Sequence, residues 1–170
     1  MSILKIKIAP DRTLNYVSDE VSDDEFGGEL NSLASDMIET MEYNGGIGLA
    51  AIQVGVRKRV LVANIDGEII TMINPVIINS SEDCSSMREG CLSVPSMLES
   101  IERPIDISVK YRNLDGGYEE GSFFGDSSHI IQHEIDHLDG KTILNKISRL
   151  KRDVYTRKVK KIRRKLAKFL

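Results

Sequence analysis

Residues 132–140 read Gln132-His133-Glu134-Ile135-Asp136-His137-Leu138-Asp139-Gly140, and this stretch decides much of what the chain can be. Its two histidines are four residues apart, so on a helix they lie on one face and can bind one metal ion. Glu134 directly follows the first histidine and can take a proton from a water molecule bound to that ion. Binding to the metal lowers the pKa of this water from about 15.7 to about 7. The pattern alone leaves two interpretations open, a metal site and a helix that happens to carry two histidines.

A third ligand is needed, because a catalytic metal site usually takes three protein ligands and leaves one position open. No His or Glu follows His137, which excludes a zinc peptidase with a downstream Glu or His as third ligand. Asp139 and Asp153 are weak downstream candidates. The other candidates lie upstream and comprise one histidine, two cysteines and several carboxylates.

The upstream histidine, His129, lies four residues before His133 and therefore on the same helix face. At a rise of about 1.5 Å per residue, His129 and His137 are about 12 Å apart, which is too far for both to bind one ion. We therefore expect His129 to be a polar neighbour of the site and not a ligand.

The two cysteines differ in their surroundings. Gly90 permits an unusual backbone turn beside Cys91, which makes this thiolate an attractive third ligand. A free cysteine can equally be a small buried apolar side chain, and we expect that incidental role for Cys84 in its Ser- and Asp-rich stretch. Such sparse cysteine usage argues against a secreted disulfide scaffold and favours a reducing, cytoplasmic location.

Hydrophobic periodicity and turn residues predict an α+β fold, in which antiparallel or mixed sheets pack around the central helix that carries His133. Strand-like runs precede that helix and do not alternate with helices. The predicted strands are 59–64, 68–74 with an extension over 75–79, 98–101, 105–111 and 118–124. The predicted helices are 25–43, a central one that starts at Asp126, Ser127 or Ser128 and ends near 139–140, and a last one over about 148–170. The 170 residues fit one catalytic domain, 1–170.

The composition is that of an ordinary globular protein, with 41% hydrophobic residues and a net charge of −3. The first residues alternate charged and apolar side chains and lack the apolar stretch of a secretory signal. No run approaches the roughly 18 apolar residues that span a membrane. We therefore expect no membrane partner and no DNA partner.

The C-terminal segment is strongly basic. Residues 149–170 hold eleven Lys or Arg and one acid, whereas the other residues hold 12 basic and 25 acidic side chains. One apolar stripe is expected along this helix, formed by Leu150, Val154, Ile162, Leu166 and Phe169. The charge suits contacts with nucleic-acid phosphates; the alternative is an amphipathic helix that packs on its own acidic body.

Three motifs, in this order, resemble those of the peptide deformylase family: GIGLAAIQ at 46–53, EGCLSVP at 89–95 and QHEIDHLDG at 132–140. The steps Pro10-Asp11, Asn74-Pro75 and Arg103-Pro104 are also similar to family features, so the resemblance covers nearly the whole chain. It implies removal of the formyl group from the N-terminal formylmethionine of nascent polypeptides, with release of formate. In bacterial members of the family, the C-terminal helix docks on the ribosome.

The resemblance implies a role for each matching residue. Cys91, His133 and His137 would bind one divalent metal ion, typically Fe²⁺, which Zn²⁺, Ni²⁺ or Co²⁺ can replace. Glu134 would act as general base and then as the acid that protonates the leaving amine. The tetrahedral oxyanion would accept hydrogen bonds from the Gln53 side chain and the Leu92 backbone N–H. The substrate would contact the motif residues Gly46, Ile47, Gly48, Glu89 and Gly90, and also His129 and Ile130 just before the third motif.

Some charged residues and departures from the family pattern leave questions open. Glu89 and Arg103 could form a solvated salt bridge or belong to the site, and Asp136 could orient a neighbour of a metal-bound histidine. Residues 125–129 are more polar than is usual in the family, which puts the rim of the substrate pocket in question. Ser96 stands where Gly is common, and Asn145-Lys146 replaces the usual Asp-Arg.

Two other functions compete with a deformylase. The first is a metal-dependent peptidase that acts on internal bonds, against which the missing downstream ligands speak. The second is a catalytically idle relative that binds ribosomes through the basic tail. The intact Cys91, Gln53 and Glu134 argue against that second alternative.

Overall fold

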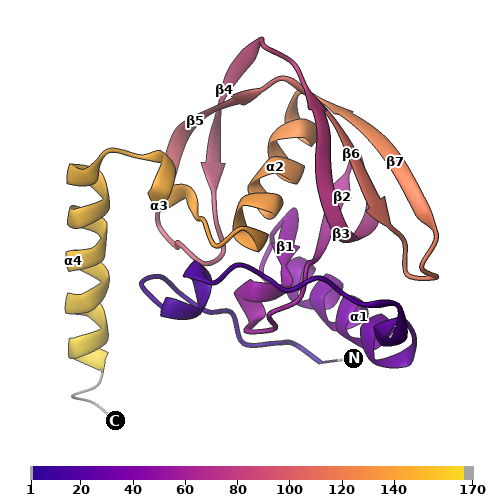
Figure 1. The fold of residues 1–170 in the computed structure, drawn as a ribbon. Coiled ribbons are helices and arrows are strands. Elements are labelled where there is room, and N and C mark those ends of the chain that lie inside the picture. The colour runs from indigo at the N-terminus through magenta and orange to yellow at the C-terminus, as the bar shows by residue number, and fades with distance from the viewer. Residues whose placement is uncertain (1, 167–170) are drawn as a thin grey trace.

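The computed structural model describes the backbone of residues 2–166 and the side chains of residues 2–162, and it confirms the α+β fold (Figure 1). The strands are β1 (Gly48–Ala50), β2 (Val60–Ile65), β3 (Glu68–Ser80), β4 (Cys84–Gly90), β5 (Leu98–Pro104), β6 (Asp106–Arg112) and β7 (Tyr118–Phe124). The α-helices are α1 (Gly28–Tyr43), α2 (Asp126–Leu138), α3 (Ile143–Lys146) and α4 (Arg149–Leu166). Short 3₁₀ turns are η1 (Arg12–Asn15), η2 (Asp23–Glu25) and η3 (Ala51–Val54).

All the strand pairs are antiparallel, and they form a five-stranded sheet of order β1-β2-β3-β6-β7 and a separate β4–β5 pair. The predicted hairpin between β2 and β3 is confirmed. Ile65 pairs with Glu68, and the two turn residues Asp66 and Gly67 both have positive φ, 53° and 92°. Such a turn matches the twist of the strands, which explains why Asp-Gly stands there.

The helix α2 runs between the β4–β5 pair and the larger sheet (Figure 1). Ile131, Ile135 and Leu138 recur at helical spacing on α2 and are buried against the larger sheet. Their partners there include Leu61 of β2 and Met72 of β3. The apolar side of α2 therefore packs into the core, and its histidine side faces the β4–β5 pair.

The strand β2 is buried on both faces, which explains its nearly continuous apolar run. Leu61 belongs to the core cluster around α2, whereas Val60 and Val62 belong to the cluster under α1. In that second cluster, Met37 and Met41 of α1 are fully buried. The sheet thus lies between α1 and α2, and its edge strand β1 contacts α2.

One predicted helix start is confirmed, since α2 begins at Asp126, and the predicted start of the first helix is wrong. The first helix begins at Gly28, because Gly27 has a φ of 136° and separates it from η2, which holds the predicted start Glu25. The cap of α2 is Gly125. The Ser127 hydroxyl instead accepts the backbone N–H of Phe124 and donates to the carbonyl of the same residue. The Ser128 hydroxyl donates to the Pro104 carbonyl.

The sequence did not reveal two of the strands, β1 and β4. β1 is only three residues long and lies inside a Gly- and Ala-rich motif. β4 is almost entirely polar, since its sequence is CSSMREG. The regular apolar alternation of a half-buried strand is missing in both, and each forms because a neighbouring strand supplies its backbone partners.

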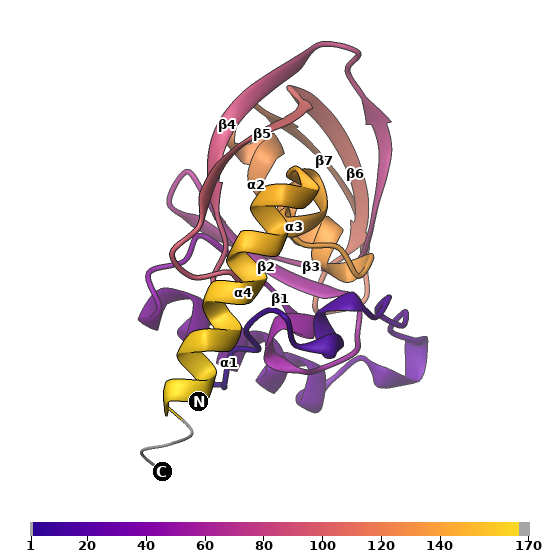
Figure 2. The ribbon, with the colours of Figure 1, turned by 90° about the vertical axis from the view of Figure 1, so that its left-hand side faces the viewer.

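The predicted apolar stripe of the last helix is wrong. Leu150, Val154 and Ile162 are 72%, 53% and 47% exposed, whereas Tyr155 and Val159 make the contact with the body. The side chain of Leu166 and all of Phe169, the other two predicted members, lie outside the described residues. Figures 1 and 2 show α4 at one side of the molecule, connected through α3.

Two further observations concern the surface. Cys84 was expected to be a small buried side chain, but it is exposed at the start of β4. No helix within residues 2–166 combines the length and the apolar character that a membrane crossing requires.

Candidate active site

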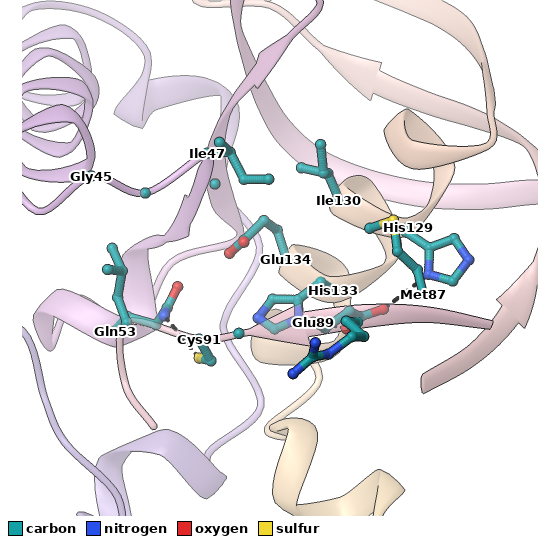
Figure 3. Close-up of a pocket in the computed structure, with 15 residues that line it drawn as sticks. Gly45, Ile47, Gln53, Met87, Glu89, Cys91, His129, Ile130, His133 and Glu134 are labelled. Carbon is teal, nitrogen blue, oxygen red and sulfur yellow. Dashed lines mark hydrogen bonds and ion pairs between the residues drawn. The ribbon is translucent and has the colours of Figure 1, made fainter. Parts of the chain in front are cut away.

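The three motifs meet at one pocket of about 360 Å³ (Figure 3). The first motif supplies β1 and η3, the second forms the end of β4 and the turn after it, and the third lies mostly on α2. Predicted site residues that line the pocket are Gly46, Ile47, Gly48, Gln53, Glu89, Gly90, Cys91, Leu92, His129, Ile130, His133 and Glu134. The fold thus brings together residues that are up to 88 positions apart in the chain, from Gly46 to Glu134.

Three donor atoms converge beside this pocket. The Sγ atom of Cys91 lies 3.2 Å from Nε2 of His137, and that nitrogen lies 3.2 Å from Nε2 of His133. The three donor atoms all lie within 4.8 Å of one another. His137 is fully buried below the pocket, and burial holds its pKa well below the usual range. A neutral imidazole is the form that binds a metal.

The spacing of these donors fits one divalent ion. With bond lengths of about 2.3 Å to sulfur and about 2.0 Å to nitrogen, tetrahedral ligands are about 3.3 to 3.6 Å apart. The observed separations from the His137 nitrogen are 3.2 Å to Cys91 and 3.2 Å to His133, so a small shift would admit an ion. Within the described residues, Cys91, His133 and His137 are the one group of at least three His, Cys, Asp or Glu side chains whose donor atoms converge in this way.

A buried carboxylate orients one of these histidines. Oε2 of Glu89 lies 2.9 Å from Nδ1 of His133, which places the proton on Nδ1 and leaves Nε2 free for a metal. Glu89 also accepts two hydrogen bonds from Arg103, at 2.6 and 2.9 Å. Burial by itself would raise the pKa of Glu89, but the hydrogen bonds from His133 and Arg103 hold it well below its usual range.

The interpretation of Arg103 as one end of a solvated salt bridge is wrong. Its side chain is 3% exposed and reaches Asp136 of α2 at 2.7 Å as well as Glu89. Asp136 in turn lies 3.3 Å from Nζ of Lys146. Lys146 therefore contacts the same network, while its neighbour Asn145 caps α3 by accepting the Thr142 backbone N–H.

Glu134 is held in an unusual environment. It is 4% exposed, and its Oε2 atom has no hydrogen-bond partner within the described residues. Burial raises its pKa to about 7, although the charges of His133 and Arg103 act in the opposite direction. A Cβ atom at Gly48 would collide with its carboxylate. The site therefore holds a carboxyl that exchanges a proton near neutral pH, with an oxygen left free for another molecule.

The Gln53 amide has a fixed orientation. Its Oε1 accepts the Ala50 backbone N–H at 2.7 Å, so its Nε2 points to Ser93 Oγ at 3.1 Å and to Cys91 Sγ at 3.7 Å. The Leu92 backbone N–H makes no hydrogen bond within residues 2–166. The Gln53 amide of the first motif and the Leu92 backbone N–H of the second motif are therefore both present at the pocket beside Cys91.

The polar segment before the histidine face of α2 does not form an open rim. Ser128 is fully buried, and His129 is 1% exposed although it lines the pocket. Three further residues that line the pocket, Gly45, Met87 and Arg88, were not predicted. Met87 and Arg88 were missed because β4 was not predicted. Gly45 could have been found from the sequence, because it directly precedes the first motif.

Comparison with known proteins gives consistent matches along the chain. A family model described as Polypeptide deformylase matches residues 3–153. A peptide deformylase from Phenylobacterium zucineum is 42% identical over 166 residues, which cover 95% of this chain and 97% of that protein. A crystal structure of peptide deformylase from Ehrlichia chaffeensis aligns with a TM-score of 0.91 at 38% identity, over 96% of this chain and 98% of that one. A further structure of that protein, in complex with actinonin, has a TM-score of 0.90 at 41% identity, over 95% and 98% of the two chains.

Proposed function

The chain belongs to the polypeptide deformylase family, and we propose that it removes the formyl group of N-terminal formylmethionine with one divalent metal ion held by Cys91, His133 and His137. The observation that carries this proposal is the convergence of one thiolate and two imidazoles within 4.8 Å beside a buried carboxyl with a free oxygen, Glu134. An ion at this position supplies a Lewis acid that lowers the pKa of a water molecule to about 7.

Glu134 is the proposed general base and acid. In its ionised form it takes the proton of the attacking water, and it later gives that proton to the amine that leaves. Its pKa of about 7 suits both steps, because a catalytic group works best when its pKa lies near the working pH. Its carboxyl faces Gly48, so the reacting carbonyl would bind beside β1.

Gln53 and Leu92 are the proposed donors to the oxyanion. Attack on the formyl carbon moves negative charge onto its oxygen, and fixed N–H groups at that position lower the barrier. The Gln53 amide is fixed by the Ala50 N–H, and the Leu92 backbone N–H is free for a ligand. The Gln53 Nε2 would turn one N–H from Cys91 or Ser93 toward the oxyanion.

The pocket supports a formylmethionine side chain as the bound group. Its wall includes Ile47, Ile130 and Met87 of β4, whose side chain is drawn beside His129 (Figure 3). Gly46 and Gly48 leave the backbone open there, since a Cβ at Gly46 would lie 2.8 Å from Leu92. Apolar walls with a few fixed donors are typical of a small-molecule or peptide-end site.

A formate-release assay with defined metal content tests this function. Protein purified without oxygen and loaded with Fe²⁺ should release formate from formyl-Met-Ala-Ser, and chelation should abolish the release. Reloading with Zn²⁺, Ni²⁺ or Co²⁺ should restore different rates, because a Cys-His-His ligand set suits each of these ions. We propose Fe²⁺ as the ion used in the cell. Cleavage of internal bonds in an unformylated peptide, without formate release, would instead support a peptidase.

The basic helix α4 supports a second part of the proposal, docking on the ribosome where nascent chains emerge. Its exposed cations include Arg157, Lys158, Lys160 and Lys161, and the exposed Leu150 and Val154 lie on the same helix. Contacts between such cations and RNA phosphates weaken as salt rises. We further propose that residues 1–170 act as one cytoplasmic catalytic domain, because its substrate would be made in that compartment.

Charge removal on α4 tests the docking. The triple variant Arg157→Gln, Lys158→Gln, Lys161→Gln should co-sediment with ribosomes less than the unchanged chain, and the salt dependence should become shallower. The matched control removes three exposed cations elsewhere, Lys5, Arg12 and Lys141. Equal loss in both triple variants would show only a general charge effect and would contradict a specific role of α4.

A further inference from the structure

His129 is a buried histidine that the proposed chemistry leaves without a role. Its side chain is 1% exposed, and both ring nitrogens have partners on β4. Nδ1 lies 3.0 Å from Oε1 of Glu89, and Nε2 lies 3.0 Å from Oγ of Ser85. A buried imidazole bound at both nitrogens has a single orientation, because turning the ring would break both contacts.

The direction of these hydrogen bonds follows from the carboxylate. Both oxygens of Glu89 accept N–H bonds from Arg103, so the carboxylate also acts as an acceptor toward His129, and Nδ1 of His129 carries the donated hydrogen. Nε2 then accepts the hydroxyl hydrogen of Ser85. The chain of donors therefore runs from Ser85 through His129 to Glu89, and Glu89 closes it by accepting Nδ1–H of His133.

The two oxygens of Glu89 have different neighbours. Oε2 accepts from His133 and from Nη2 of Arg103, and Oε1 accepts from Nε of Arg103 and from His129. Each oxygen is thus fixed from two directions. Without His129, Oε1 would keep the contact with Arg103 alone, and the carboxylate would lose one of the four hydrogen bonds that fix its orientation.

We propose that His129 is a positioning residue of the metal site. It fixes the Glu89 carboxylate so that Oε2 meets Nδ1–H of His133, and this contact turns Nε2 of His133 toward Cys91 and His137. The inference rests on the proposed metal site. Residues that orient a ligating histidine commonly change metal affinity by about 10- to 100-fold, and His129 acts one contact further away.

A set of substitutions at this one position separates positioning from packing. His129→Leu keeps an apolar volume and removes both hydrogen bonds. His129→Asn places an amide nitrogen near the position of Nδ1 and keeps a donor for Glu89. His129→Gln places its amide nitrogen near the position of Nε2 and loses that donor. Ser86→Ala is the control, because Ser86 is exposed on the same strand.

The measurement is the Zn²⁺ dissociation constant of metal-free protein, determined by competition with a coloured chelator. We expect His129→Leu and His129→Gln to bind Zn²⁺ about 5- to 10-fold more weakly than the unchanged chain. His129→Asn should stay within about 2-fold of the unchanged chain, as should Ser86→Ala. Thermal unfolding of the metal-free variants, measured in parallel, reports any general loss of stability.

The outcomes are distinguishable. Equal Zn²⁺ affinity in the unchanged chain and His129→Leu would overturn the inference and leave the metal site intact. Equal losses of Zn²⁺ affinity in His129→Leu and His129→Asn, matched by equal losses of thermal stability, would show that His129 only stabilises the packing of α2 against β4. Failure of the unchanged chain to bind Zn²⁺ or Fe²⁺ would instead overturn the proposed function itself.

Discussion

Gly48 lies so close to the carboxylate of Glu134 that no side chain fits between them. The contact joins β1 to the centre of α2. It explains why a glycine stands in the short strand β1, where a side chain would normally be favourable. It also means that the backbone of β1 fixes the position of the proposed general base.

Replacing Gly48 by Ala should therefore displace Glu134. The added methyl group meets the buried carboxylate, and a displacement of about 1 Å can cost about 100-fold in rate. We expect kcat for formate release to fall by about that factor, with metal content unchanged. Gly28→Ala is the control, since its Cβ meets nothing within 4 Å. Full activity in Gly48→Ala would show that the carboxylate has room to adapt.

Glu134→Gln should abolish formate release and, in the metal-free protein, raise the stability of the fold. The folded pKa of Glu134 is raised from 4.5 to about 7, so its protonated form stabilises the fold below pH 4.5 and this contribution is lost as the pH rises to about 7. The neutral Gln avoids that loss. We expect a gain of about 3 kcal/mol at pH 8 and almost none at pH 4, measured by urea unfolding. A gain that is equal at both pH values would argue against a buried, shifted carboxyl.

Arg103→Ala should destabilise the protein strongly. It would leave Glu89 and Asp136 without their shared partner, and breaking a buried ion pair on one side costs about 3–5 kcal/mol. The matched surface variant is Arg57→Ala, whose partner Asp19 is 61% exposed; it should cost less than about 0.5 kcal/mol. Denaturant unfolding of both variants gives the comparison, and similar midpoints would contradict a structural role of the buried network.

Ser96→Gly should stabilise the protein. Ser96 has a φ of +63°, a left-handed conformation that costs a residue with a Cβ about 1–2 kcal/mol. Part of this gain is lost because glycine is more flexible in the unfolded chain, so we expect about 0.5–1 kcal/mol from thermal unfolding. Ser100→Gly, in strand β5, should have the opposite sign. A lower melting temperature for Ser96→Gly would show that the Ser96 side chain contributes contacts that outweigh the strain.

Residues 132–140 were sufficient to predict the central helix and its two histidines, because a spacing of four residues has the same meaning in any helix. The hairpin of β2 and β3 was also predictable, since Asp66-Gly67 forms a local turn. The polar strand β4 was not predictable in this way, although it carries Glu89 and faces His129. Its conformation comes from pairing with β5, and seven residues separate the two strands in the chain.

The last helix shows the same limit in another form. Its existence over about 148–170 was predicted from composition, and the structure confirms it over Arg149–Leu166. Its contact with the body is made by Tyr155 and Val159, which were not among the residues of the predicted apolar stripe. A helix with apolar residues on two sides can pack with either, and the shape of the surface it meets decides between them.

Short-range spacing along the chain was enough to predict the α+β class, the histidine face of α2 and the three motifs. The burial of Arg103 between Glu89 and Asp136, the contact of Gly48 with Glu134 and the contact of His129 with Glu89 became visible in the tertiary structure alone. Those contacts join segments 14 to 86 residues apart. Their charges and pKa values depend on burial and on distance through space, which spacing along the chain does not encode.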